Sequence, residues 1–287
     1  MRDRLPDWLR NKSPLEVKTN EVREVLRELN LNTVCYSARC PNRGQCYGEG
    51  TATFLILGDV CTRNCRFCAV AKGLVQPLDP TEPERVLAAV KRLNLRHVVI
   101  TSVTRDDLLD GGTSQFIKII RLIKENSATV SVEVLTPDFK GDKALILSVA
   151  ETGPDIYNHN LETVPSLYER IRPEADYRRS LKLLQWVKEY SGKLLTKSGI
   201  MVGLGENRGE VEQVLDDLRA VDCDILTIGQ YLQPTRNHLP VEEYVRPETF
   251  EEWRELALEK GFKYVASGPL VRSSFHAGEA ASLAMDF

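Results

Sequence analysis

The sequence contains no run of the ~20 apolar residues that a membrane-spanning helix requires. Its first ten residues, Met1 to Arg10, have no apolar core and no small-residue cleavage site, so the pattern predicts no secretory signal. We therefore expect a cytoplasmic protein with no membrane partner.

An excess of charge of one sign is also missing. The 287 residues include 38 Lys and Arg against 41 Asp and Glu, which gives a net charge of −3 and a pI near 5.9. Domains that bind nucleic acid are usually strongly basic, so we expect no nucleic-acid partner, but a small molecule or a protein. The apolar fraction of 42% is ordinary for a globular protein and predicts a packed core.

Cysteine is present in an odd number, seven, and six of the seven fall in two tight groups between residues 35 and 68. A disulfide framework is usually spread over a secreted domain, whereas thiols clustered in a cytosolic-looking chain usually hold metal. The histidines His159, His238 and His276 show no ligand spacing and are expected to be structural. The sequence therefore predicts a cysteine-based metal protein.

The second of these groups is Cys61, Cys65 and Cys68, in the pattern C-x3-C-x2-C, directly after an apolar run that ends at Leu57. A cubane iron–sulfur cluster normally takes four protein sulfurs, so a loop with three leaves one iron open to a small molecule. Zinc is the alternative, but a zinc site needs a fourth ligand and usually a second cysteine pair. We therefore interpret this loop as a catalytic cluster site.

The first group is Cys35, Cys40 and Cys46, in the pattern C-x4-C-x5-C. Pro41 and Gly44 lie within it, so a loop is expected rather than a regular helix. A second cluster that lacks one cysteine ligand is the natural inference; three buried free thiols are the alternative.

From residue 51 onward, β-type and helix-type segments alternate, which predicts a parallel sheet with right-handed crossovers. We expect an α/β fold, an incomplete (β/α)6 TIM-like barrel over residues 51–262, with extensions at 1–50 and 263–287 covering its open end. Thr81 and Glu84 are expected to form a capping box. The expected strands are Thr51–Leu57, His97–Ser102, Thr129–Thr136, Ile156–Leu161, Thr196–Val202 and Ile225–Tyr231. The expected helices are Asn20–Leu29, Glu82–Leu93, Ser114–Glu125, Lys143–Glu151, Tyr177–Tyr190, Glu210–Ala220 and Pro247–Lys260.

The chemistry of such barrels gathers at the carboxyl ends of the strands. Several polar residues are expected there as candidate ligand-binding groups; they are Glu133, Asn158 and Asn160, with Arg170 or Arg172 as a carboxylate partner. Solvated loop positions and surface ion pairs are the alternatives for these residues.

The cysteine loop, with Phe67 just before its last cysteine, resembles the radical S-adenosylmethionine (SAM) enzymes. The Cys35–Cys46 triplet, the segments Thr104–Leu108 and Ser198–Glu206, and the terminal Arg272–Ala277 together resemble the lipoyl synthases. The similarity covers nearly the whole chain.

This resemblance implies two [4Fe–4S] clusters and SAM, whose cleavage gives a 5′-deoxyadenosyl radical. It implies insertion of sulfur at C6 and C8 of an octanoyl group on a lysine of a lipoyl-carrier protein, with the second cluster as the sulfur donor. Ser274 is the implied odd ligand of that cluster and Ser273 the reserve; a hydrogen-bonded turn is the alternative for both serines. It also places Gly203 and Gly205 near the adenosine.

A monomer served by an external electron donor, such as ferredoxin or flavodoxin, is expected. The alternatives are a biotin synthase-like or methylthiotransferase enzyme, a ferredoxin-like electron carrier, and a zinc-stabilised binding protein.

Overall fold

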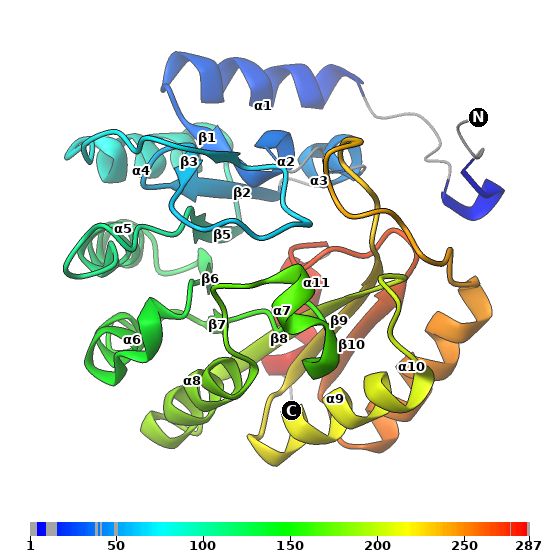
Figure 1. The fold of residues 1–287 in the computed structure, drawn as a ribbon. Coiled ribbons are helices and arrows are strands. Elements are labelled where there is room, and N and C mark those ends of the chain that lie inside the picture. Colours follow the sequence, from blue (N-terminus) through cyan, green and yellow to red (C-terminus); the bar gives the residue numbers. More distant parts are fainter. Residues whose placement is uncertain are drawn as a thin grey trace.

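The computed structural model describes residues 5–9, 16–37, 40, 42–48, 51–275 and 277–285. One sheet dominates the fold, and its strands follow the order of the chain from β1 to β10 (Figure 1). Its seven parallel strands are β2 (Thr51–Ile56), β5 (His97–Ser102), β6 (Ser131–Leu135), β7 (Ile156–Asn158), β8 (Leu195–Val202), β9 (Ile225–Gln230) and β10 (Tyr264–Gly268). The short β1 (Asn32–Thr33) pairs antiparallel with β2 at the first edge. Among the described residues the two edges do not pair, which confirms an open, TIM-like partial barrel.

The sheet has one parallel strand more than the six predicted. The additional strand, β10, lies in the segment assigned to the C-terminal extension, and it pairs with β9 from Tyr264↔Ile225 to Gly268↔Gly229. Val265 is its only β-branched residue. Strand propensity is therefore weak here, and pairing with β9 decides the conformation.

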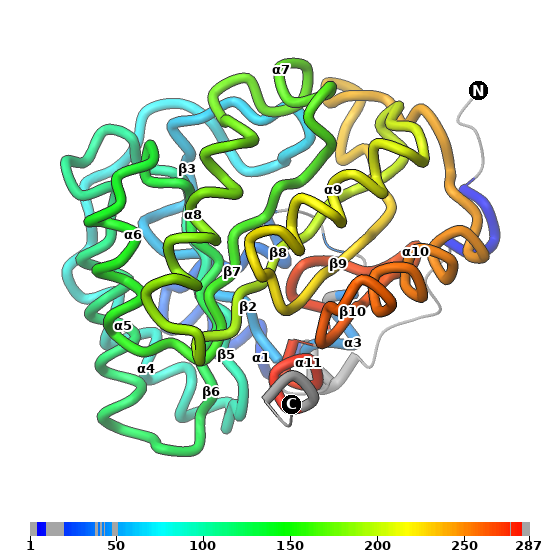
Figure 2. Tube along the Cα trace, turned by 90° about the horizontal axis from the view of Figure 1, so that it is seen from below, coloured from blue at the N-terminus to red at the C-terminus, as the bar shows by residue number. Residues whose placement is uncertain are grey.

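Six helices connect successive strands and lie on the outside of the sheet (Figure 2). The apolar face of the first, α4, buries Val86, Ala89 and Val90, at the spacing that places side chains on one side of a helix. All six helices were predicted to within two residues at each end. They are α4 (Glu82–Arg92), α5 (Thr113–Asn126), α6 (Lys143–Ala150), α8 (Tyr177–Tyr190), α9 (Arg208–Ala220) and α10 (Pro247–Glu259).

Acidic and amide side chains cap several of these helices. Asp142 accepts from the N–H groups of Ala144 and Leu145 at the start of α6, and Asn207 forms a capping box with Glu210 at the start of α9. The capping box predicted at Thr81 is wrong. The Thr81 hydroxyl donates to Asp79 Oδ1 at 2.7 Å and makes no cap bond.

Short elements complete the chain between the strands and before them. Two-residue strands β3 (Val60–Cys61) and β4 (Ala71–Lys72) pair with each other across the cysteine loop. The remaining short elements are η1 (Asp7–Leu9), α2 (Val34–Ser37), α3 (Arg43–Gly48), η2 (Phe139–Gly141), η3 (Pro165–Leu167) and α7 (Tyr168–Ile171). The first cysteine group therefore lies partly on two helical turns where a loop was expected, with Cys35 in α2 and Cys46 in α3, and α3 includes Gly44.

The extensions pack against opposite parts of the barrel. In the N-terminal extension, α1 (Glu16–Glu28) contacts α3 and α4, and α2 and α3 contact β2. In the C-terminal extension, α11 (Ala277–Met285) contacts β5 and β10 (Figure 2). Ala281 of α11 packs with Ile156, Leu195 and Ile225, the first residues of β7, β8 and β9. Helix α11 therefore covers the amino-terminal ends of the strands and leaves the carboxyl ends to the cavity.

No helix in the described ranges combines the length and apolar character needed to cross a membrane.

The C-terminal tail passes so close to β9 that only glycine fits at position 229. A Cβ on Gly229 would lie 2.1 Å from the carbonyl oxygen of Val271. We expect Gly229→Ala to displace the tail and to lower the melting temperature by about 5 °C, since overpacking costs roughly 1–3 kcal/mol and each kcal/mol shifts Tm by about 2–4 °C in a chain of this size. Calorimetry measures this.

Gly192→Ala is the matched control, because a Cβ at Gly192 would have no atom within 4 Å. Equal melting temperatures for the two variants would contradict the close approach of the tail.

Candidate active site

A cavity of about 1390 Å³ lies at the carboxyl ends of the strands, lined by both extensions as well as by the barrel. The two cysteine groups, 15 residues apart in the chain at their nearest members Cys46 and Cys61, both line it, and so does the tail after β10. The predicted site residues that line this cavity are Cys35, Cys40, Cys46, Cys61, Cys65, Phe67, Cys68, Asn160, Arg172, Ser273 and Ser274.

The cysteine loop begins with a left-handed residue at the end of β2. Leu57 has φ 68°, a conformation that costs about 1 kcal/mol or more in a residue other than glycine. Two buried side chains hold its backbone: Glu82 Oε2 accepts from the Leu57 N–H at 3.0 Å, and Arg105 Nη1 donates to its carbonyl at 3.2 Å. These contacts fix the direction in which the loop leaves the barrel.

The Cys61 sulfur receives two backbone hydrogen bonds. The N–H of Thr104, in the loop after β5, donates to Cys61 Sγ at 3.3 Å, and the N–H of Arg63 donates at 3.4 Å. The Thr62 N–H and hydroxyl also donate to the Thr104 carbonyl, at 3.0 and 2.9 Å. Hydrogen bonds to cysteine sulfur stabilise thiolates and tune the potentials of iron–sulfur clusters.

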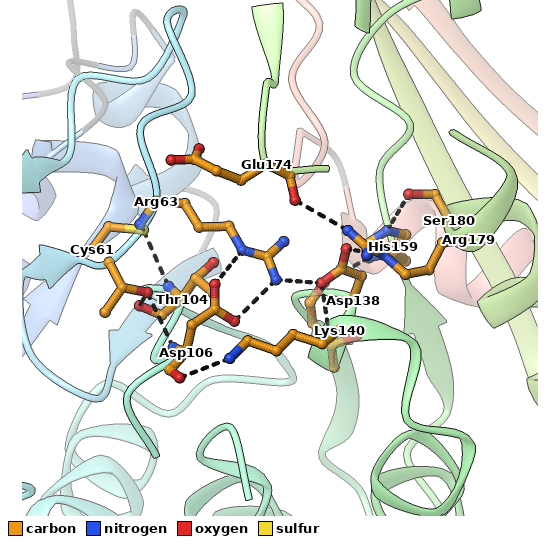
Figure 3. Close-up of polar contacts among 12 residues, drawn as sticks. Cys61, Arg63, Thr104, Asp106, Asp138, Lys140, His159, Glu174, Arg179 and Ser180 are labelled. Carbon is orange, nitrogen blue, oxygen red and sulfur yellow. Dashed lines mark hydrogen bonds and ion pairs between the residues drawn. The ribbon is translucent and has the colours of Figure 1, made fainter. Parts of the chain in front are cut away.

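Arg63 ties the cysteine loop to two further strand ends (Figure 3). Its Nε donates to Asp106 Oδ2 at 2.6 Å, and its Nη2 lies 2.7 Å from Asp138 Oδ1. The other Asp138 oxygen accepts from Arg179 Nε at 2.8 Å. Burial would raise the pKa of Asp138, but the Arg63 and Arg179 guanidinium groups outweigh it and lower that pKa to about 2. Asp138 therefore stays charged and, together with Asp106, holds Arg63.

The far side of the cysteine loop is held by main-chain contacts. The N–H of Arg66 donates to the carbonyl of Ile171 at 2.9 Å, and the N–H of Leu239 donates to the carbonyl of Arg66 at 3.4 Å. His238 Nε2 lies 3.1 Å from the carbonyl of Cys68. The segments after β5, β6, β7 and β9 thus all hold this loop, and His238 has the structural role expected of it.

Of the two arginines predicted as carboxylate partners, only Arg172 enters the cavity. Its Nη1 donates to the carbonyls of Asn160 and Leu161, both at 3.0 Å. Burial raises the pKa of the Cys65 thiol, and the positive charge of Arg172 beside it opposes that rise. Arg170 instead pairs with Glu242 at 2.5 Å on the surface.

The first cysteine group lies against the C-terminal tail. The N–H of Cys40 donates to the carbonyl of Cys35 at 3.1 Å, and Asn42 Nδ2 donates to the carbonyl of Leu270 at 2.5 Å. Burial raises the pKa of the Cys35 thiol to about 11. Burial also lowers the pKa of Arg272, which the neighbouring Cys40 opposes. The tail therefore brings a guanidinium group to this triplet, and sequence reasoning gave Arg272 no role beyond the motif.

Other predicted site residues lie outside the cavity. Glu133 and Asn158 lie beneath it as fully buried side chains, because their strands place them inside the barrel. Gly203 is enclosed by Gln230 and the carbonyl of Glu243, and Gly205 lies near Arg170. The glycine of this segment that lines the cavity is Gly199, within β8.

The two triplets suit clusters rather than single ions. In the part of the chain that the structure describes, no three His, Cys, Asp or Glu side chains converge closely enough to hold one metal ion. The thiolates of a cubane cluster bind different irons and so stand apart around it. The shared cavity, the N–H donors at Cys61 and the guanidinium groups beside Cys65 and Cys40 fit two anionic clusters.

Comparison with known proteins identifies the family. The model for the radical SAM superfamily matches residues 55–218, and the model for the N-terminal domain of lipoyl synthase matches residues 1–40. The lipoyl synthase of Caldanaerobacter subterraneus subsp. tengcongensis is 57% identical over 98% of both chains, and that of Caldicellulosiruptor saccharolyticus is 53% identical over 97% of this chain and 98% of its own. The chain belongs to the lipoyl synthase family.

Membership in this family gives the activity and decides among the alternatives that the sequence left open. The chain is a radical SAM enzyme of lipoyl synthesis that uses SAM and two [4Fe–4S] clusters. The predicted enzyme class and the predicted cofactors, SAM and two [4Fe–4S] clusters, are confirmed.

Solved structures share the fold at low sequence identity. Methylornithine synthase has a TM-score of 0.57 at 17% identity, over 86% of this chain and 81% of its own. HydG, a maturase of the [FeFe]-hydrogenase, has a TM-score of 0.57 at 13% identity, over 96% of this chain and 69% of its own. These similarities show the barrel alone.

His159 gives a pH dependence that can be tested. The ring is buried, and its Nδ1 lies 2.8 Å from the Thr136 carbonyl and its Nε2 3.0 Å from Ser180 Oγ. Burial, with Arg172, lowers its pKa from 6.5 to about 4. Between pH 6.5 and 4 the unfolded chain therefore binds one more proton, and the free energy of unfolding falls as the pH falls, by up to about 1.4 kcal/mol per pH unit.

We expect His159→Gln to remove this component of the slope in urea unfolding between pH 7 and 5. The same slope in wild type and variant would contradict a neutral buried His159.

Proposed function

We propose that the chain transfers sulfur from the auxiliary cluster, held by Cys35, Cys40 and Cys46, to C6 and C8 of a protein-bound octanoyl group. One observation supports this proposal: both cysteine groups and the tail serines Ser273 and Ser274 line the same cavity. When bound, the cluster held by Cys61, Cys65 and Cys68, here called the radical-loop cluster, would supply the 5′-deoxyadenosyl radical with SAM, and the auxiliary cluster would supply sulfide. The sulfide donor must meet the carbon from which the radical has abstracted hydrogen, and one shared cavity allows these two groups to come together.

Ser274 is the proposed fourth protein ligand of the auxiliary cluster. The neighbouring Ser273 is already engaged, since its Oγ donates to Asn160 Oδ1 at 3.1 Å and accepts from Asn158 Nδ2 at 2.9 Å. Ser274 follows it in the chain and lines the same cavity. A serine oxygen is a harder ligand than a thiolate and suits iron less well, so an iron held by Ser274 would be released more readily than one held by a cysteine, and its release would expose a sulfide.

The substrate and the electron source are also part of the proposal. Apolar side chains in the cavity suit an octanoyl chain, and they include Val34, Leu55, Val103, Leu135, Ile200 and Met201. The lysine that carries this chain would belong to a lipoyl-carrier protein, and ferredoxin or flavodoxin would supply electrons. We propose a cytoplasmic monomer, in a compartment that keeps the six thiols reduced.

Iron and sulfide content tests the two-cluster assignment. We expect Cys35→Ala and Cys61→Ala each to retain about half of the wild-type iron, because each variant loses one of two cubane clusters. Cys223→Ala is the matched control, since Cys223 is buried beside β9 and does not line the cavity; it should retain all the iron. Loss of all the iron in both variants, or of none in either, would contradict two independent sites.

Ser274→Cys tests the role of the serine. A thiolate would hold the cluster at least as well as the hydroxyl, so we expect wild-type iron content with lipoyl formation reduced about 100-fold or more, in line with the removal of a group needed at the reacting centre. Mass spectrometry of the octanoylated carrier measures the product. Normal product yield from Ser274→Cys would refute the proposed release of sulfide at the serine-bound iron.

A further inference from the structure

A fully buried ion pair lies inside the barrel, beneath the cavity. Lys197 Nζ of β8 lies 2.9 and 3.0 Å from the two carboxylate oxygens of Glu133 of β6, and both side chains have an exposed fraction of 1% or less. His97 Nε2 approaches Glu133 at 3.6 Å from β5. Burying two charges is costly unless further hydrogen bonds satisfy them, and such a pair is often no more stable than apolar residues of similar size. Stability alone therefore does not account for the buried Glu133–Lys197 pair.

Asn158 connects this pair to the C-terminal tail. Its Nδ2 donates to Glu133 Oε1 at 2.8 Å and to Ser273 Oγ at 2.9 Å. Asn158 stands on β7 directly opposite Lys197 on β8. The Ser273 hydroxyl then donates to Asn160 Oδ1 at 3.1 Å, and Asn160 Nδ2 donates to Glu162 at 3.0 Å. A continuous path of hydrogen bonds thus runs from the barrel interior to the tail.

Each hydrogen bond along this path can run in only one direction, because each group must act either as donor or as acceptor. The Glu133 carboxylate only accepts hydrogen bonds. Burial would raise its pKa, but the charge of Lys197 outweighs this and lowers that pKa to about 2, so the carboxylate stays charged. A flipped Asn158 amide would turn its oxygen toward this carboxylate, so Glu133 fixes the amide with Nδ2 facing both partners. Ser273 Oγ must then accept a hydrogen bond from Asn158 Nδ2 and donate its own hydrogen bond to Asn160 Oδ1. The charge of Glu133 therefore sets the direction of the Ser273 hydroxyl.

The tail on either side of Ser273 is held mainly by backbone. The N–H of Val271 donates to the carbonyl of Gly268 at 3.0 Å, and the N–H of Phe275 donates to that of Arg272 at 2.9 Å. Ser273 provides a side-chain link from this turn to the barrel interior.

We propose that Glu133, Lys197 and Asn158 are positioning residues that act through Ser273 to orient the Arg272–Ser274 turn, so that Ser274 is presented to the auxiliary cluster. This inference rests on the proposed ligand role of Ser274. Glu133, Lys197 and Asn158, which are not cluster ligands, thereby control how readily the auxiliary cluster loses iron.

The test measures the rate at which a chelator removes iron from the auxiliary cluster, with Cys61→Ala as background so that this cluster alone contributes iron. We expect Ser273→Ala and Asn158→Ala to accelerate iron release about tenfold, the lower end of the usual effect of removing a group that orients a metal ligand. Ser273→Thr keeps the hydroxyl and should stay within twofold of the background. The double variant Asn158→Ala/Ser273→Ala should be no faster than either single variant, because both interrupt the same path.

Ser282→Ala is the matched control, since the exposed Ser282 hydroxyl lies on α11 of the same C-terminal extension and donates to the Gly278 carbonyl at 3.1 Å. It should leave the rate unchanged. Iron release from the radical-loop cluster, measured with Cys35→Ala as background, should also be unchanged in Ser273→Ala and Asn158→Ala. Acceleration at both clusters would mean a general loss of structure and would overturn the inference.

Ser274→Ala separates the two proposals. If it accelerates release from the auxiliary cluster while Ser273→Ala and Asn158→Ala behave like Ser282→Ala, the ligand proposal stands and the positioning inference is wrong. If Ser274→Ala itself leaves the rate unchanged, the ligand role of Ser274 is wrong and the positioning inference falls with it.

Discussion

The Arg63 guanidinium, held between the carboxylates of Asp106 and Asp138, is the interaction on which the catalytic end of the barrel depends. Arg63 belongs to the cysteine loop, whereas the two aspartates follow β5 and β6. One side chain thus fixes a loop that has little regular structure of its own to two neighbouring strand ends. Hydrogen bonds to charged partners contribute more than neutral ones, and burial reduces their screening by salt.

The tail is linked to the barrel interior by a second, separate set of contacts. Glu133 and Lys197 lie inside the barrel, and Asn158 and Ser273 connect this ion pair to the tail. The radical loop and the tail therefore have independent supports, one above the strand ends and one beneath. Such independence suits the proposed function, in which one cluster would break C–H bonds repeatedly while the other would be consumed, since a change at one need not disturb the other.

Much of this architecture was predictable, and the failures have identifiable causes. The periodicity of α4 or α8 predicts a helix because each buries one regular face, and the C-x3-C-x2-C spacing indicates a cluster because the ligands are local. Strand β10 was missed because pairing with β9 outweighs weak propensity. Arg170 and Arg172 stand two residues apart and read alike in sequence, and only the short helix α7 and the turn after it decide which one enters the cavity. Glu133 and Lys197 are 64 residues apart, so no local pattern could pair them.

The openness of the barrel explains where its specificity lies. Solved structures at 13–17% identity share the barrel, so the barrel alone does not define the product. The features that distinguish this family attach where a closed barrel would have no free position: β1, α2 and α3 pack at the β2 edge, and the tail leaves from β10 at the other edge. Closure would pair β2 with β10 and remove both attachment sites. An incomplete sheet is therefore what allows Cys35, Cys40, Cys46 and Ser274 to reach the cavity from opposite sides.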